Sequence, residues 1–161
     1  MAEKGFIYKG MKPAYWCPHD QTALAEAEIE YADDPCTTIF VKFPVLDDNG
    51  KLGQYCDLAK LYFVIWTTTP WTIPGNMAIS VNGDFEYVLL QAPNGEVYIL
   101  AKELVKSVCK AAGLNEEQCS VLATVMGSDL ELMKAKHPLF DRESMILCGD
   151  HVTLEAGTGC V

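Results

Sequence analysis

The sequence predicts a mainly β protein whose strands form a closed or nearly closed β-barrel with peripheral α-helices. Short segments of alternating or continuous apolar residues recur along the 161 residues, and turn residues separate them at fairly even spacing. Only residues 102–112 have the i, i+3, i+4 apolar spacing of an amphipathic helix. Because no predicted strand leads through a glycine-rich loop into a helix, a doubly wound nucleotide-binding fold is not expected.

Two of the predicted strands lie near the start of the chain. Residues 14–17 are expected to form a short strand. Residues 22–31 alternate, with small and apolar residues on one face and Glu26, Glu28 and Glu30 on the other. A metal or acid–base site is one interpretation of these carboxylates, but a solvated strand face is strongly favoured.

Turn and helix signals separate the remaining elements. Residues 47–50 and the pair Asn94-Gly95 are typical hairpin turns, and Gly113 is expected to end the helix. Residues 130–136 fit a strand or a helix equally well. Further strands are expected at 39–45, 61–65, 77–81, 85–91, 97–101, 119–126, 144–148 and 152–154.

A buried strand that leads into a polar bend forms the centre of the sequence. Residues 61–65 are apolar on both faces, as in a strand that is covered on both sides. Pro70 and Pro74 lack a backbone N–H and fix φ, so no regular ladder or helix is expected to pass through them. The three threonines at 67–69 therefore lie on a rigid bend, where their hydroxyls can face a pocket. By itself, a threonine-rich strand end is more often a structural turn.

The composition indicates a single domain over residues 1–161, with 1–21 leading into a barrel over 22–161. Half of the residues are hydrophobic and 21% are charged, and the chain has neither an apolar run of transmembrane length nor a signal peptide. Seven cysteines are scattered without a Cys-x-x-Cys pair. Reduced thiols, a cytoplasmic location and no membrane association are expected.

The histidines give no clear signal for metal or nucleophilic catalysis. Cys17-Pro18-His19 is too tightly spaced for a zinc site and fits a turn better. His137 precedes a proline and is expected to end an element. His151 follows Asp150, so a polar contact behind the site is one interpretation, although a structural role is favoured. No metal site and no catalytic triad are predicted.

Residues 66–72, Trp-Thr-Thr-Thr-Pro-Trp-Thr, continue as Ile-Pro-Gly-Asn and resemble the threonine-rich peptide of isoleucyl-tRNA synthetase editing domains, in the class I aminoacyl-tRNA synthetase family. Residues 12–31 and 149–161 resemble other segments of that domain, so the resemblance covers nearly the whole chain. The related valyl and leucyl enzymes typically place an arginine where this chain has Thr69. A valyl-type or leucyl-type editing domain is therefore a disfavoured alternative.

The resemblance implies the same barrel and the hydrolysis of valyl-tRNA(Ile), with valyl-adenylate as a second substrate. An apolar pocket cannot separate isoleucine from valine well enough by binding, and isoleucyl-tRNA synthetase is itself the standard example of this limit. By motif position, the residues around the substrate ester and terminal adenosine would be Thr67, Thr68 and Thr69. The other substrate-binding positions would be Trp66, Thr72, Asn76, Gly157, Thr158 and Gly159, the glycines allowing the backbone to approach the ligand.

In that family the Gly-Thr-Gly-Cys-Val stretch leads into a segment that supplies a histidine and an aspartate to the site. The sequence here ends at Val161. We expect the chain to lack the aspartate that holds the substrate's ammonium, a charged hydrogen bond typically worth about 1.5–3 kcal/mol. Poor hydrolysis by the chain alone is therefore expected.

The net charge of −10 argues against a strong grip on tRNA by this chain alone. We expect it to admit only the single-stranded 3′ end of tRNA(Ile), while the rest of the synthetase, joined in cis, holds the body. No cofactor is expected for this domain, since ATP and Mg belong to the catalytic domain of such an enzyme. The chain is expected to be a monomer. A non-catalytic barrel module that binds the tRNA end is the alternative.

Overall fold

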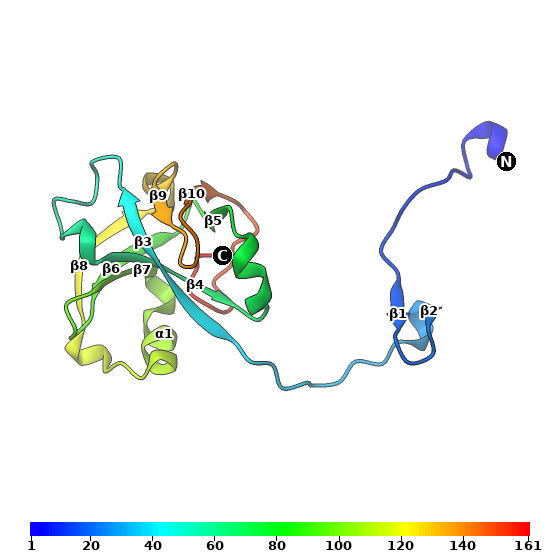
Figure 1. Cartoon of the computed structure of the whole chain (residues 1–161), viewed down its shortest axis with the longest axis horizontal. Helices are drawn as coiled ribbons and strands as arrows, with labels where there is room; N and C mark the ends of the chain where they lie inside the picture. Colours follow the sequence, from blue (N-terminus) through cyan, green and yellow to red (C-terminus); the bar gives the residue numbers. More distant parts are fainter. The chain divides into compact units, whose positions relative to one another are not determined.

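A computed structural model describes residues 1–161 (Figure 1). Contacts divide the chain into two compact units, Met1–Pro35 and Cys36–Val161. This boundary lies fourteen residues beyond the expected end of the leading segment at residue 21.

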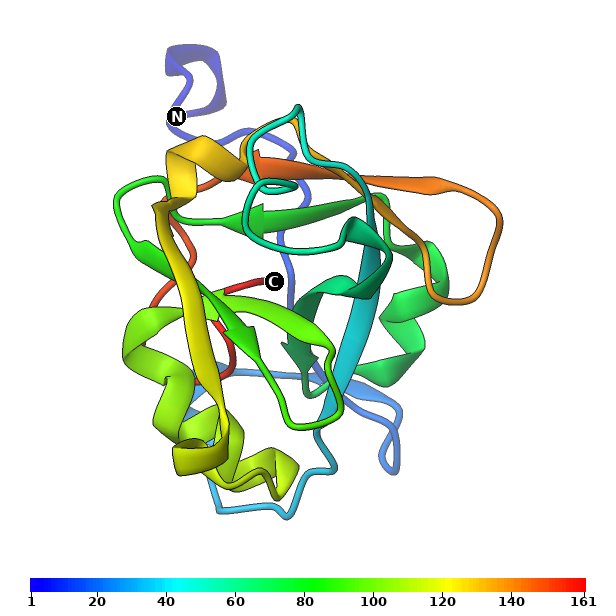
Figure 2. The ribbon, with the colours of Figure 1, turned by 90° about the vertical axis from the view of Figure 1, so that its left-hand side faces the viewer.

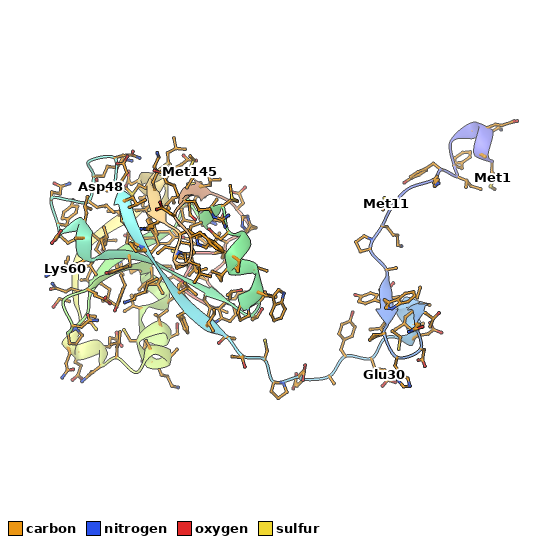
Figure 3. All side chains as sticks on the ribbon, in the orientation of Figure 1. Met1, Met11, Glu30, Asp48, Lys60 and Met145 are labelled. Carbon is orange, nitrogen blue, oxygen red and sulfur yellow. The ribbon has the colours of Figure 1, made fainter.

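The first unit is a small hairpin with helical turns around it. Strand β1 (Tyr15–Cys17) pairs with β2 (Thr22–Leu24). No side chain of this unit is buried, and Met11 and Glu30, which Figure 3 labels, are both exposed. The strand predicted over 22–31 is wrong beyond Leu24, because the chain turns into the 3-10 helix η2 (Glu26–Glu28). The Glu28 carboxylate accepts the N–H of Ala25 at 2.7 Å and caps this turn. The unit also contains η1 (Ala2–Lys4).

An eight-stranded sheet forms the second unit, which confirms the mainly β prediction. Its strand order is β5-β10-β9-β3-β4-β7-β6-β8. The pairs β4–β7 and β5–β10 are parallel and the other pairs are antiparallel. The strands are β3 (Ile39–Asp47), β4 (Leu61–Thr67), β5 (Ala78–Val81), β6 (Glu86–Gln91), β7 (Val97–Ala101), β8 (Ser120–Met126), β9 (Lys134–Lys136) and β10 (Glu143–Cys148).

The two end strands, β5 and β8, are not joined by a ladder, so the paired sheet is open between them. Loop contacts bring the segments that follow these strands together. Ser128 donates its N–H to the Gly83 carbonyl at 3.1 Å. Gly127 lies so close to Asn82 that a Cβ would be 2.0 Å from the Asn82 carbonyl oxygen. Closure into a complete barrel stays a prediction.

Helix α1 (Val105–Ala112) follows the 3-10 turn η5 (Lys102–Leu104) and ends at Gly113, which has φ +67°. The predicted helix is therefore confirmed, and Val108 and Cys109 are buried. In both views α1 lies at the lower end of the second unit, and β9 and β10 lie at the upper end (Figures 1 and 2). No helix combines the length and the apolar character needed to cross a lipid bilayer. The remaining 3-10 helices are η3 (Leu58–Lys60), η4 (Pro70–Gly75), η6 (Glu116–Gln118) and η7 (Gly127–Leu130).

The turn after β3 is built around one buried carboxylate. Asp48 is 5% exposed and accepts the backbone N–H groups of Gly50, Leu52 and Gly53 at 3.0, 2.6 and 2.7 Å. Burial acts to raise the pKa of Asp48, but these backbone donors outweigh it, so the pKa lies below the ordinary value. The charged carboxylate therefore stabilises the folded turn.

Strand β4 is the central strand of the core and is buried on both faces, as predicted. Leu61, Phe63 and Val64 are all at most 7% exposed. The strand predicted at 152–154 is wrong. The free edge of β5 is occupied by the chain end instead, where Ser80 and Val161 exchange backbone hydrogen bonds at 2.7 and 3.0 Å.

Candidate active site

The threonine bend, residues 67–76, follows directly from the end of β4. Its prolines lie inside η4, so the prediction that no helix passes through them is wrong. Pro70 occupies the first position of η4, where a backbone N–H has no partner in the helix, and a short 3-10 turn tolerates Pro74. The N–H and hydroxyl of Thr72 both donate to the Thr69 carbonyl, at 3.0 and 2.8 Å, and so fix the first turn.

The three central threonines have different surroundings. The Thr67 hydroxyl accepts the N–H of Thr69 at 3.0 Å and lies 3.5 Å from the Thr69 hydroxyl. Both side chains are half-buried. Thr68 is exposed, and its hydroxyl has no partner in the protein. Of the three hydroxyls, that of Thr68 is therefore the one free to bond a ligand or a water.

A cavity of about 320 Å³ lies between the threonine bend and the C-terminal segment. Trp66, Thr67 and Thr68 line one side of it, and residues 157–161 and His151 line the other. The structure thus brings together two motifs that are about 90 residues apart in sequence. Thr69 does not line this cavity.

A second cavity, of about 470 Å³, adjoins the first and shares Trp66, Thr67 and Val161 with it. Thr72 and Asn76 line this second cavity. The Asn76 amide is already engaged by the protein, since it donates to the Ala78 carbonyl at 2.8 Å and accepts from the Ser144 hydroxyl at 2.7 Å. Asn76 therefore contributes shape to the wall rather than a free hydrogen-bonding group.

The two glycines of the C-terminal motif are needed for close approach within the protein. Gly157 and Gly159 have φ of +80° and +76°. A Cβ on Gly157 would lie 3.0 Å from the Trp66 ring, and a Cβ on Gly159 would lie 2.5 Å from the Cβ of Ala101. Thr158 is 1% exposed, and its hydroxyl bonds the N–H and carbonyl of Cys160. The expected approach of these glycines to a ligand stays a prediction.

His151 lines the first cavity and is exposed, a placement that the sequence argument underrated. Its neighbour Asp150 and its position near the C-terminal motif were the signals for it. His19 lies in the turn at 18–21, as predicted, and His137 is buried. No three His, Cys, Asp or Glu side chains lie close enough together to hold a metal ion. All seven cysteines are free thiols.

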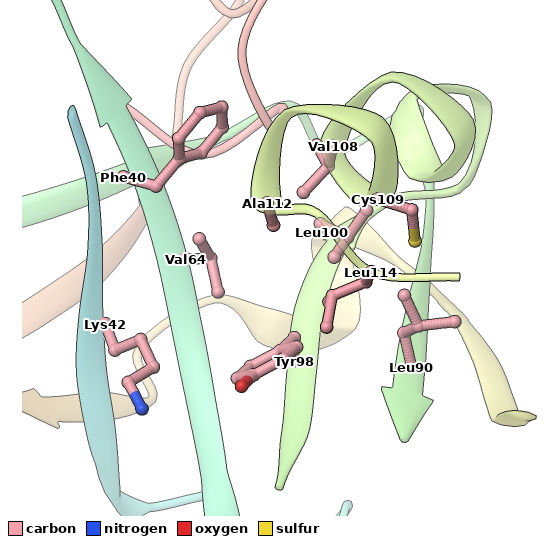
Figure 4. A pocket seen from close by; sticks show the side chains of 10 residues that line it. All are labelled: Phe40, Lys42, Val64, Leu90, Tyr98, Leu100, Val108, Cys109, Ala112 and Leu114. Carbon is pink, nitrogen blue, oxygen red and sulfur yellow. The ribbon is translucent and has the colours of Figure 1, made fainter. Parts of the chain in front are cut away.

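A third cavity, of about 270 Å³, lies between α1 and the sheet (Figure 4). Its wall is mostly apolar, with Phe40, Leu100 and Val108 among the side chains that Figure 4 labels. The single charged side chain there, Lys42, is paired with Glu96 at 2.7 Å. This cavity offers no free polar group for a reaction, so the threonine cavity is the candidate active site.

The family of class I tRNA synthetases for I, L, M and V matches residues 1–137. Isoleucine–tRNA ligase of Thermoanaerobacter sp. (strain X514) is 57% identical over 162 residues, and that of Caldicellulosiruptor bescii is 54% identical over 162 residues. In each case all of this chain is matched, but it spans only 17% of the relative's length.

Two solved structures share the fold. The crystal structure of GlLeuRS-CP1 superposes with a TM-score of 0.64 at 20% identity, covering 78% of this chain and 53% of that one. The editing domain of P. knowlesi cytosolic leucyl-tRNA synthetase gives 0.63 at 14% identity, covering 81% and 58%. The family match over residues 1–137, together with the isoleucine–tRNA ligase relatives, places the chain in the class I tRNA synthetases of the isoleucine, leucine, methionine and valine group.

Proposed function

We propose that this chain is the editing domain of an isoleucine–tRNA ligase and that it hydrolyses valyl-tRNA(Ile), with valyl-adenylate as a second substrate. The observation that supports this most is the meeting of the threonine bend and the Gly-Thr-Gly segment across one cavity of about 320 Å³. The isoleucine–tRNA ligase relatives, at 54–57% identity, favour this amino acid over the valyl-type and leucyl-type alternatives.

The geometry suits hydrolysis by positioning. Ester hydrolysis needs a placed water and donors for the developing oxyanion, and neither requires a covalent intermediate. The free hydroxyl of Thr68 can hold a water or a ribose hydroxyl at the cavity mouth. Thr67 fixes the backbone beneath it through its bond to the Thr69 N–H. We expect this chemistry to need no cofactor.

The tRNA would contact this chain through its end alone. A net charge of −10 disfavours contact with the phosphates of a duplex. We infer that the rest of the ligase, joined in cis, holds the tRNA body and that the single-stranded 3′ end carrying valine reaches the cavity. The isolated chain should then bind tRNA weakly.

Deacylation of valyl-tRNA(Ile) tests this function in a whole enzyme. The segment would replace its counterpart in the Thermoanaerobacter ligase, which matches all of this chain. Thr68→Val removes the free hydroxyl and keeps the shape, and we expect kcat to fall roughly 100- to 1,000-fold, by analogy with the loss of one positioned donor. Thr124→Val, an exposed threonine on β8, is the matched control and should have no effect.

Unchanged deacylation by Thr68→Val would contradict the proposed role of the threonine bend. The chain alone is assayed in parallel, and slower hydrolysis than in the whole enzyme is expected. The second candidate, a module that only binds the tRNA end, is favoured by the engagement of Thr67, Asn76 and Thr158 with the protein itself. It would be supported if the whole enzyme binds a valyl-adenosine analogue through this cavity but does not hydrolyse the ester.

A further inference from the structure

His137 is a buried histidine that lines none of the three cavities described above. It directly follows β9, as its position before a proline predicts, and it is 1% exposed. The rings of Phe43 and Phe140 pack around it, with centroids 6.0 and 5.2 Å away. A buried imidazole in an apolar setting is stable only if both ring nitrogens find partners.

Hydrogen bonds assign the tautomer of this imidazole. Nδ1 accepts the N–H groups of Leu139 and Phe140, at 3.1 and 3.2 Å, so it carries no proton. The proton is therefore on Nε2, which donates to the Ile73 carbonyl at 2.8 Å. Ile73 belongs to η4, the helical part of the threonine bend. One nitrogen thus orders the loop of His137, and the other reaches across to the candidate active site.

The same β9–β10 hairpin contacts the bend at two further points. The Arg142 guanidinium donates through Nη2 to the Pro74 carbonyl, and the buried Ser144 hydroxyl donates to Oδ1 of Asn76 at 2.7 Å. These contacts and the His137 bond fall on Ile73, Pro74 and Asn76, within four consecutive residues of the bend. Because the two prolines of η4 donate no backbone hydrogen bond, bonds from outside are important for its position.

We propose that His137 is a positioning residue for the editing site: its Nε2–H fixes η4 and thereby the wall of the adjoining cavity and the orientation of the threonines. This inference rests on the proposed function for its catalytic consequence. Ile73, the acceptor of the His137 bond, itself lines the cavity beside Thr72, so displacement of its backbone changes the cavity directly.

Two substitutions of His137 separate the functions of the ring nitrogens. In His137→Gln the amide nitrogen can take the place of Nε2 and keep the bond to Ile73, while the Nδ1 acceptor is lost. In His137→Asn the amide oxygen can take the place of Nδ1 and keep the loop bonds, while the donor to Ile73 is lost. A merely structural role for His137 gives no reason for these variants to differ at the bend.

The first measurement uses the chain as it is and does not depend on activity. Amide hydrogen exchange over residues 66–76 should accelerate at least about tenfold in His137→Asn and stay within about threefold of the original in His137→Gln, because only the former frees η4. His19→Gln, in the exposed turn of the first unit, is the matched control. Equal exchange of the bend in both His137 variants would overturn the proposal.

The second measurement is deacylation of valyl-tRNA(Ile) in the whole ligase that carries the segment. His137→Asn should lower kcat about tenfold and also raise KM, because the cavity wall changes, and His137→Gln should retain most of kcat. If the ligase that carries the unaltered segment does not deacylate valyl-tRNA(Ile) while the exchange result holds, the proposed function fails and the structural part of the inference survives. If Thr68→Val is slow but His137→Asn is fully active, the positioning role is overturned. If His137→Asn does not fold, the folded His137→Gln variant decides. Loss of its kcat overturns the positioning role of His137, and a retained kcat supports it.

Discussion

Replacing Gly159 by alanine tests the packing of the C-terminal motif against the sheet. Gly159 has φ +76°, and its backbone passes Ala101 of β7 so closely that a new Cβ would lie 2.5 Å from the Ala101 Cβ. The neighbouring backbone is tied to the same place, because the Ala101 N–H donates to the Thr158 carbonyl at 2.8 Å. The segment cannot move away from Ala101 without losing this bond.

Two costs add up in Gly159→Ala. A left-handed backbone conformation costs an alanine roughly 1–2 kcal/mol, and an overpacked buried methyl costs typically about 1–3 kcal/mol. The free energy of unfolding should therefore fall by about 2–5 kcal/mol. At roughly 4 °C per kcal/mol for a domain of this size, Tm should drop by roughly 8–20 °C.

Gly50→Ala is the matched control. Gly50 has φ +72°, but no atom lies within 4 Å of the position its Cβ would take. This variant should lose only the conformational part, about 1–2 kcal/mol. The difference between the two variants, measured by urea unfolding at one pH, isolates the contact with Ala101.

A double-mutant cycle identifies the contact directly. In Gly159→Ala combined with Ala101→Gly, the nearest remaining atoms to the new methyl are 3.5 Å away, an ordinary van der Waals distance. The pair should therefore be more stable than the sum of the single variants predicts, by about 1–3 kcal/mol. Additive losses, or a Gly159→Ala variant as stable as Gly50→Ala, would refute the argument.

Three further predictions concern buried groups. Asp48→Asn should lower the free energy of unfolding by about 1–3 kcal/mol at pH 7, because an amide cannot satisfy the three backbone N–H donors. Since the pKa of Asp48 is lowered in the folded protein, this stabilisation is present above about pH 4 and disappears as the pH falls through the folded pKa. Urea unfolding at pH 3 should therefore show a smaller difference in stability between Asp48→Asn and the original protein than at pH 7. Tyr87→Phe should lower the free energy of unfolding by about 1–3 kcal/mol, because the buried Tyr87 hydroxyl donates to the Gly159 carbonyl at 2.5 Å and accepts the Asn82 N–H. An unchanged midpoint of urea unfolding would contradict this. Burial raises the pKa of Cys109 to about 11, so a disulfide reagent should modify it roughly 100-fold more slowly than the exposed Cys36, and equal rates would count against this burial.

The elements that were predicted well are those whose signal is local. The apolar run 61–65 has few alternatives to a strand covered on both faces, and β4 is such a strand. The helix at 102–112 had both an apolar stripe and Gly113 as a stop, and α1 ends there. In these stretches, periodicity and end signal agree with the tertiary structure.

The elements that were predicted wrongly were decided by partners far away in sequence. Residues 152–154 fit a strand in isolation, but Val161 already pairs with Ser80 at the edge of β5. Residues 22–31 alternate well, yet β1 offers only three residues for pairing. His137 was correctly expected to end an element, whereas its bond to Ile73, 64 residues earlier, has no local signal.

The three adjacent threonines differ in their hydrogen bonds, so they do not share one role. Thr67 is the last residue of β4, and its hydroxyl accepts the N–H of Thr69 and lies 3.5 Å from the Thr69 hydroxyl. Thr68 is exposed, and its hydroxyl has no partner in the protein. The resemblance alone assigned the three threonines one common role. Their bonding divides that role: Thr67 and Thr69 hold the shape of the bend, and Thr68 presents a free hydroxyl. Loss of shape should affect substrate binding and turnover together, whereas loss of the Thr68 hydroxyl should affect turnover first.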